Sequence, residues 1–345
     1  RTWRFIMAIL KVDTISGIGT EGSVFEGDIE FTSQNFLTLP KGNTEERGRG
    51  TRAVFGNGSS NVLDFVNIQN TANATDFGDA LNTYGASAAC SSRTRGIIFA
   101  GFLSPAESNV IEFITFSTTG NAQDFGDLTQ GRRNLTGFSN QTRGIAAGGS
   151  IQSPSTTLNN IDFITIASAG NATDFGDLIN PLSADPSGFS SPTRGVIAGG
   201  ESPSPLNAGT DIIQFVTIAS TGNATDFGDL TSVQSRGDGT SSQTRGIIYS
   251  GKRNPASYSN VIEFVTIATT GNGADFGDAR VAVTNTAATS NSLRAVFGGG
   301  YVPGSNTDDI HYLEIQSMGN SVFFGELTSA RREFGASSEA HGGLD

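Results

Sequence analysis

Six acidic residues at near-constant spacing are the part of this sequence best suited to chemistry. Each follows a Phe-Gly pair and closes one copy of a repeat of about fifty residues. The closing acids are Asp79, Asp127, Asp177, Asp229, Asp278 and Glu326. An arginine opens each copy, and these opening arginines are Arg52, Arg95, Arg143, Arg194, Arg245 and Arg294. Because the planar guanidinium suits carboxylates and backbone carbonyls, we predict that each opening arginine bridges repeats through a closing acid or a main-chain oxygen.

A metal site is the first alternative for these acids. Asn73, Asp76 and Asp79 are spaced three residues apart, and other copies share the pattern. Calcium binds carboxylate and carbonyl oxygens, but residues three apart on a strand point to opposite faces. The pattern therefore favours turn capping and contacts between repeats, and we predict neither a metal site nor a cofactor.

Enzymatic chemistry has little support in the sequence. Asp-Phe-Gly holds magnesium in protein kinases, but repeated copies without the kinase lysine strand or a His-Arg-Asp loop exclude that interpretation. Asn-x-Thr sequences such as that at Asn171 mostly belong to the repeated turn, so we interpret them as structural. The only histidines are His311 and His341, and nothing marks an acid–base pair. We predict a non-enzymatic protein without catalytic residues.

The composition limits the partners. The chain has 345 residues, three lysines and a formal net charge of −12, which argues against nucleic acid because phosphate binding needs clustered Lys and Arg. Cys90 is the only cysteine, so no intrachain disulfide is expected. No apolar run reaches the length of a membrane-spanning helix, so we predict no membrane insertion. Arg1–Leu10 is interpreted as a strand or arm and not as a signal peptide.

Each repeat resolves into four short strands, named a to d here. Strand b is an apolar run such as Arg143–Ala147, strand c is one such as Val261–Ile267, and strand d carries Asp-Phe-Gly-Asp. Strand a, as in Arg132–Ser139, lies between strand d of one copy and the opening arginine of the next. Thr-Gly-Asn or Ala-Gly-Asn turns join c to d, because Gly and Asn tolerate positive φ.

Four short strands in each of six copies are typical of a β-propeller. The prediction is therefore an all-β protein with six blades. Little chain before Arg52 could supply strand a of the first blade. We predict that Arg331–Ser338 enters that blade and closes the ring, which would remove exposed sheet edges.

Two domains are predicted: an N-terminal attachment segment, residues 1–42, and the propeller, residues 43–345. In the first, Lys11–Ser16 and Gly27–Thr32 alternate polar and apolar residues, as short half-buried strands do. This extended β segment has too little apolar surface to fold alone. It is expected to lie against a partner or against its own copies.

The repeat resembles the kelch repeat. Strand b ends in two glycines at Gly148-Gly149, Gly199-Gly200 and Gly299-Gly300, and the other copies keep the second glycine. The kelch tyrosine position is held by Phe65, Phe113, Phe163, Phe215, Phe264 and Tyr312, and the kelch tryptophan position by Phe77, Phe125, Phe175, Phe227, Phe276 and Phe324. The resemblance covers about residues 44–345. It implies a divergent kelch-like propeller closed by its C-terminal strand.

Two segments resemble proteins of marine tailed bacteriophages. Leu10–Gly22 is similar to the N-termini of phage appendage proteins, and Asn-Ala-Thr-Asp-Phe-Gly-Asp-Leu-Thr is similar to part of predicted virion proteins. The resemblance implies a structural virion protein of the tail or fibre type, made in the host cytoplasm. Its N-terminal segment would bind other virion proteins while the repeat domain projects.

The loops between strands b and c vary while the frame stays constant, and variable loops on a rigid frame often carry recognition. They should emerge on one face together with the d–a connections. The predicted binding residues are Tyr258, Tyr301, Glu201 and Arg253. This face is predicted to bind a host-surface glycan or protein, or a neighbouring virion protein. The sequence leaves open whether the chain forms a homo-oligomer. The alternatives are that the loops are solvated connectors, or that the chain is a cellular kelch-like scaffold or an unrecognised carbohydrate-active propeller.

Overall fold

The computed structural model describes residues 52–344 except residues 59, 100, 204–207 and 254–256. The chain divides into two compact units between Glu45 and Glu46, and the described residues belong to the second unit. The predicted attachment segment, residues 1–42, lies outside them. The described residues form strands and no helix, and the strands of each sheet pair antiparallel. The predicted all-β class is confirmed.

The four strands of each repeat are present in order. Strand a is β4 (Ala88–Ser91), β10 (Thr136–Ser139), β16 (Ser187–Ser190), β20 (Asp238–Ser241), β24 (Ala287–Ser290) and β30 (Gly335–Ser338). Strand b is β1 (Arg52–Gly56), β5 (Arg95–Phe99), β11 (Arg143–Ala147), β17 (Arg194–Ala198), β21 (Arg245–Arg253) and β25 (Arg294–Gly298). Strand c is β2 (Ser60–Asn67), β8 (Val110–Thr115), β14 (Asn160–Thr165), β18 (Thr210–Thr217), β22 (Ser257–Thr266) and β28 (Asp309–Glu314). Strand d is β3 (Thr75–Tyr84), β9 (Gln123–Asp127), β15 (Thr173–Asp177), β19 (Thr225–Ser235), β23 (Ala274–Asp278) and β29 (Val322–Glu326). Short hairpins in three b–c loops are β6 (Phe102–Leu103) with β7 (Ala106–Glu107), β12 (Ser150–Ile151) with β13 (Thr156–Thr157), and β26 (Tyr301–Val302) with β27 (Ser305–Asn306).

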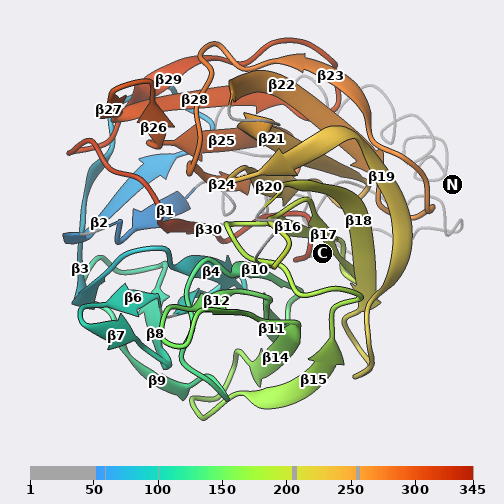
Figure 1. Ribbon diagram of the computed structural model, residues 1–345. Coiled ribbons are helices and arrows are strands. Elements are labelled where there is room, and N and C mark those ends of the chain that lie inside the picture. The colour runs from blue at the N-terminus through green and yellow to red at the C-terminus, as the bar shows by residue number, and fades with distance from the viewer. Residues whose placement is uncertain (1–51, 59, 100, 204–207, 254–256, 345) are drawn as a thin grey trace, which may run out of the picture. The chain divides into compact units, whose positions relative to one another are not determined.

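The sheets keep the order a-b-c-d. Four sheets have four strands each, and in one of them β30 from the C-terminal end pairs with β1. In the largest sheet β19 extends to pair with β21, which joins the fourth and fifth repeats. Figure 1 shows the a strands near the centre and the d strands at the rim. Each a strand neighbours the next, in the cycle β30, β4, β10, β16, β20, β24 and β30 again.

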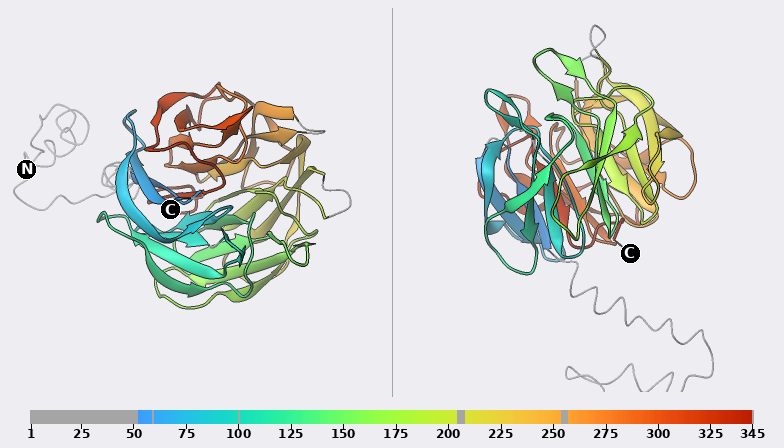
Figure 2. Two further views of the ribbon diagram at one scale, coloured as in Figure 1. Left: turned by 60° about the vertical axis from the view of Figure 1, so that its left-hand side comes forward. Right: turned by 90° about the horizontal axis from the view of Figure 1, so that it is seen from below.

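The hydrophobic core lies between neighbouring sheets. One cluster joins Phe99 of the second repeat to Ile164 of the third. Another joins Phe55 of the first repeat to Phe324 of the sixth, so the two ends of the repeat array share a core. The side views in Figure 2 show the sheets stacked on one another face to face. Within each repeat the aromatic residues of strands c and d pack edge to face, with ring centroids 5.9 to 6.0 Å apart.

Strand a is shorter than predicted. The predicted segments 132–139 and 331–338 contain strands only at β10 and β30. Asn134 and Glu333 have φ of 55° and 60°, a left-handed conformation that turns the chain before strand a begins. The arginines of both segments therefore lie in the connection and not in the sheet.

The opening arginines bind main-chain oxygens of the following repeat. Arg95 Nη1 donates to the carbonyl oxygen of Ile166 at 3.0 Å, and its guanidinium lies over the ring of Phe113 in its own repeat. The same arrangement recurs in all six repeats. Among the described residues no closing acid forms an ion pair with an opening arginine, so the carboxylate alternative of the prediction is wrong. The start of the c–d turn in the following repeat places a main-chain carbonyl at the guanidinium, whereas the closing acids lie on strand d.

The closing acids contribute their main chain to the contact between repeats. Asp79 N–H donates to Asn121 Oδ1 in the next c–d turn at 3.1 Å, and five further copies repeat this bond. Gly120 N–H donates to the carbonyl oxygen of Phe77 at 2.8 Å. Each turn therefore binds the outer edge of the preceding strand d, which protects that edge.

This contact predicts different effects for two glycines. Gly78 and Gly120 have similar φ, 146° and 151°, but a Cβ on Gly78 would lie 2.5 Å from Gly120 C and O, while one on Gly120 would meet nothing within 4 Å. We expect Gly78→Ala to lower the free energy of unfolding by several kcal/mol, and Gly120→Ala by only about 1 to 3 kcal/mol of backbone strain. Denaturant titration of both variants checks this. Equal losses would show that the turn does not confine Gly78.

Six serines link the a strands. Ser91 Oγ donates to the carbonyl oxygen of Ser338, Ser139 Oγ to that of Ser91, and the series continues until it returns to Ser338, at 2.5 to 2.7 Å throughout. The serine ring consists of Ser91, Ser139, Ser190, Ser241, Ser290 and Ser338, all 1 % exposed or less. These bonds satisfy carbonyls at the buried end of each strand a.

Candidate binding face and central cavity

The b–c loops and the d–a connections lie together. Isolated bridges pair Gly85 with Phe102, Arg133 with Ser150, Ser183 with Glu201 and Thr284 with Tyr301. Each bridge joins a d–a connection to the b–c loop of the repeat that follows it in the sequence. The serine ring and the c–d turns lie at the opposite ends of the strands. We call the side that carries the b–c loops the loop face.

Two of the predicted binding residues are neighbours on the loop face. The rings of Tyr258 and Tyr301 lie 6.1 Å apart at an interplanar angle of 32°, and both side chains are half-buried. Tyr258 pairs with Lys252 where β21 and β22 extend beyond their sheet, and Tyr301 begins β26 of the next repeat. Arg332 places its guanidinium carbon 4.5 Å from the centroid of Tyr301. This group combines aromatic faces with a cation.

Glu201 lies on the same face but binds within the protein. Its Oε1 accepts from Ser235 Oγ at 3.2 Å and from Arg236 Nε at 3.4 Å. Ser235 ends β19, and Arg236 lies in the connection between β19 and β20. Glu201 therefore holds its loop against the d–a connection, and its carboxylate is only 18 % exposed.

Arg253, also predicted to bind a ligand, has its side chain largely buried and paired within the protein. Its side chain is 14 % exposed and forms an ion pair with Glu263, whose side chain is fully buried. Arg253 Nη2 also donates to Gln234 Oε1 at 3.2 Å. The extended hairpin of β21 and β22 turns this guanidinium inward because the buried carboxylate requires a cation.

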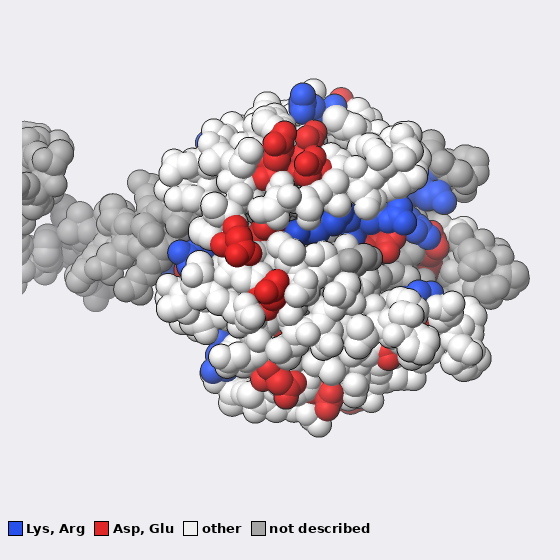
Figure 3. Space-filling view, turned by 90° about the vertical axis from the view of Figure 1, so that its left-hand side faces the viewer, with Lys and Arg blue, Asp and Glu red and all other residues white. Residues whose placement is uncertain are grey.

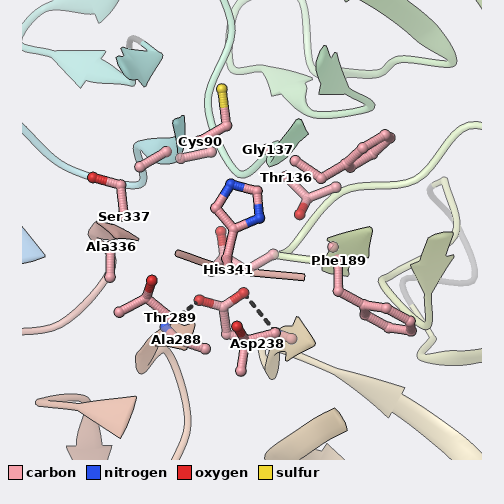
Figure 4. Close-up of a pocket in the computed structure, with 18 of the residues that line it drawn as sticks. Cys90, Thr136, Gly137, Phe189, Asp238, Ala288, Thr289, Ala336, Ser337 and His341 are labelled. Carbon is pink, nitrogen blue, oxygen red and sulfur yellow. Dashed lines mark hydrogen bonds between the residues drawn. The ribbon is translucent and has the colours of Figure 1, made fainter. Parts of the chain in front are cut away.

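A cavity of about 70 Å³ lies between the a strands. Its walls come from all six a strands, and Figure 4 shows His341 and Asp238 directed into it. Asp238 accepts from the main-chain N–H groups of Gly239 and Ala288, both at 2.7 Å. Burial raises the pKa of Asp238 to about 8 and that of Asp185 to about 7. The cavity is thus polar, with carboxyl groups that release their protons only near or above neutral pH.

The C-terminal tail, residues 339–344, closes the serine end of this cavity. Gly342 N–H donates to the carbonyl oxygen of Ser241 at 2.9 Å, and Arg93 Nε donates to that of Leu344 at 3.1 Å. A Cβ on Gly343 would lie 1.9 Å from the carbonyl oxygen of Ser139, so only glycine fits there. The tail therefore packs against the serine ring, near the centre of Figure 1.

His341 and Ser139 are close but do not form a base and nucleophile pair. His341 Nε2 lies 3.1 Å from Ser139 Oγ and 3.2 Å from the carbonyl oxygen of Ser91. Gly343 N–H donates to His341 Nδ1, which places the ring proton on Nε2. Ser139 Oγ already donates to the carbonyl oxygen of Ser91 at 2.6 Å, and burial lowers the pKa of His341 to about 4. The imidazole therefore has no free acceptor for a serine proton.

Other chemical groups of the described residues are few. They contain no group of three or more His, Cys, Asp or Glu side chains placed to hold a metal ion. No helix among them is long and apolar enough to cross a membrane. Burial raises the pKa of Cys90 to about 12, so the thiol stays protonated and unreactive. On the side drawn in Figure 3, a band of basic side chains crosses a mostly uncharged surface between acidic groups, unlike the broad basic surface that nucleic acid requires.

Several of these residues are not among the predicted binding residues. The sequence does point to Arg332, because the adjacent arginines Arg132-Arg133 of one d–a connection recur as Arg331-Arg332 in another. Arg133 lies over Phe102 at 5.1 Å as Arg332 lies over Tyr301. Nothing in the sequence points to Asp238, because the six a strands have little in common except their final serine.

No protein-family model matches the chain, and no curated protein is similar to it.

Proposed function

We propose that this chain is a non-enzymatic virion appendage protein of a tailed bacteriophage, in which a six-bladed kelch-like β-propeller binds a host-surface glycan through its loop face. The propeller architecture is supported by the pairing of β30 with β1, by the cyclic order of the a strands and by the serine ring. The virion role rests on the resemblance of Leu10–Gly22 and of the repeat to phage proteins.

The observation that carries the binding role is the group formed by Tyr258, Tyr301 and Arg332. Aromatic faces bind the apolar faces of sugar rings, and their phenol groups supply hydrogen bonds. The Arg332 guanidinium adds a donor fork that suits a sugar acid or a carbonyl. Rigid strands hold both tyrosines, so little side-chain entropy is lost when a ligand binds. A neighbouring virion protein would use the same contacts.

A test of binding uses the full chain, fluorescently labelled, on an array of bacterial surface polysaccharides and oligosaccharides. We expect Tyr301→Ala to weaken binding to the recognised glycan at least tenfold, because it removes one aromatic face and the partner of Arg332. Phe102→Ala is the matched control, since Phe102 occupies the corresponding loop position under Arg133 but has no second ring beside it among the described residues. Binding that is equally weak in both variants, or unchanged in Tyr301→Ala, would move the site elsewhere.

The virion role requires a separate measurement. Purified phage particles from the culture that carries the gene should contain peptides of this chain by mass spectrometry. Antibodies against the repeat domain should label the particles by electron microscopy. Absence of the chain from particles that contain the other structural proteins would contradict the virion role while leaving the glycan result unaffected.

Turnover of a bound glycan would contradict the non-enzymatic role.

A further inference from the structure

The sixth repeat exposes apolar side chains that no other repeat exposes in the same way. Among the described residues, eight large hydrophobic side chains are exposed by more than a third, and four of these belong to the sixth repeat. The sixth-repeat patch consists of Leu293, Met318, Val322 and Phe323, which are 50 %, 65 %, 46 % and 44 % exposed. The other four are dispersed: Leu81 lies in β3, Ile179 and Val281 lie in two d–a connections, and Leu103 lies in the hairpin of β6 and β7.

The other repeats show which residues the four-strand repeat itself requires at these positions. The frame holds an aspartate where the sixth repeat has Phe323, and that set is Asp76, Asp124, Asp174, Asp226 and Asp275. At the position of Leu293 the described copies hold Thr94, Thr142, Thr193 and Thr244. At the position of Met318 they hold Thr71, Thr119, Ala169, Thr221 and Thr270, and at that of Val322 they hold Thr75, Gln123, Thr173, Thr225 and Ala274. Folding of the repeat therefore does not need the apolar residues.

The patch lies at one end of a single sheet. Arg294, next to Leu293, pairs with Glu314 at the end of β28, and Val322 pairs with Tyr312. Met318 is in the turn that joins these two strands. These are the strand ends opposite the loop face, where the serine ring also lies.

We propose that the sixth-repeat patch is the contact through which two copies of this chain associate about a two-fold axis. The described part of each chain has one such patch, and a two-fold contact uses the same patch on both copies and closes without further growth. The four residues together expose roughly 400 Å² of surface, about half of what each partner buries in a standard interface. Flanking polar residues would supply the rim.

The charges around the patch fit self-association. A chain with a net charge of −12 repels its own copies, and Phe323 removes a carboxylate that the other repeats keep at this position. The Arg280 side chain is 51 % exposed, forms an ion pair with Asp309 at 3.7 Å and lies 5.4 Å from the centroid of Phe323. Glu314, the last residue of β28, is 47 % exposed and forms an ion pair with Arg294 at 2.7 Å. Because both signs border the patch, a two-fold arrangement can set the cation of one copy against the anion of the other. Both loop faces stay accessible in such a dimer, which would raise the avidity for a surface.

The test is the mass of the full chain in solution, measured by sedimentation equilibrium between about 1 and 100 μM, a range that brackets weak and moderate dimers. We expect a species of twice 35.8 kDa. The triple variant Met318→Thr, Val322→Thr and Phe323→Asp restores the residues of the other repeats, and we expect it to be monomeric over the whole range with an unchanged melting temperature. Ile179→Thr is the matched control, because Ile179 is 45 % exposed in another repeat, and it should dimerise like the wild type.

A monomeric wild type at the highest concentration would overturn the proposal and would leave a different protein as the occupant of the patch. A triple variant that still dimerises would overturn it as well. If the substitutions in β29 prevent folding, the double variant Leu293→Thr with Met318→Thr, which changes only turn residues, tests the proposal instead. We expect it to raise the dissociation constant of the dimer at least tenfold.

Discussion

Deletion of residues 335–345 is expected to unfold the protein or to drive it into aggregates at room temperature. The deletion removes β30, which pairs with β1 along Ala53–Gly56. It also opens the serine ring at Ser338, so that Ser91 Oγ loses its acceptor and the carbonyl oxygen of Ser290 loses its donor. The core cluster shared by the first and sixth repeats loses Ala336. An unpaired β1 would offer a free edge to other chains.

The control for this deletion is the shorter one, residues 339–345, which leaves β30 in place. It removes the contacts of the C-terminal tail with the serine ring but keeps the serine ring itself. We expect this variant to remain folded and soluble, with a melting temperature lowered by a few degrees. Circular dichroism and light scattering during heating distinguish the two deletions. A protein without residues 335–345 that melts cooperatively at the wild-type temperature would show that β30 contributes nothing to the stability of the first sheet.

The sequence was sufficient for the strand order because each repeat carries the same turn and apolar signals. Strand b of the third repeat, Arg143–Ala147, has the predicted bounds, and the double glycine Gly148-Gly149 ends it. The d–a connections were less predictable. Asn134 takes a left-handed conformation there, and an isolated asparagine after two arginines does not reveal in which direction the chain turns.

The partners of the charged residues were harder to predict than the strands. The periodicity correctly indicated that Arg95 and its equivalents contact another repeat, but it could not decide between a carboxylate and a carbonyl acceptor. That choice depends on which end of the neighbouring strand c faces the guanidinium, which is a matter of register between sheets. The closeness of Tyr258 and Tyr301 was unpredictable for the same reason, because it depends on how far β21 and β22 extend beyond their sheet.

One signal in the sequence was overlooked. Strand c has a polar residue inside its apolar run in every copy, and each is 5 % exposed or less. The set is Asp64, Glu112, Asp162, Gln214, Glu263 and His311. A polar side chain that recurs within a buried strand must have a partner. In the third repeat that partner is Arg132, whose Nη1 lies 2.9 Å from Asp162 Oδ2, and both side chains are buried.

The partner varies together with the polar residue. Arg331 pairs with Asp64 at 2.9 Å, as Arg132 does with Asp162. The fourth repeat has Gln214 in strand c and a fully buried Leu182 at the position of the arginine. The neutral pair occupies the same site in the same frame. The structure therefore contains its own charge-free version of the buried ion pair.

Replacement of Arg132 by leucine alone is expected to lower the free energy of unfolding by about 3 to 5 kcal/mol, because it leaves the Asp162 carboxylate buried without a counter-charge. Thr129 still donates its hydroxyl and its main-chain N–H to that carboxylate, which does not neutralise the charge.

The double variant Arg132→Leu with Asp162→Gln copies the fourth repeat. There Ile179 N–H donates to Gln214 Oε1 at 2.9 Å, so glutamine can accept the corresponding bond from Thr129. We expect the double variant to lie within about 1 to 2 kcal/mol of the wild type, since a buried ion pair offsets little more than its own desolvation. Urea unfolding of the wild type, both single variants and the double variant gives the coupling energy directly. The double variant could instead lose as much free energy of unfolding as Arg132→Leu alone. In that case packing of the arginine stem, and not its charge, stabilises the third repeat.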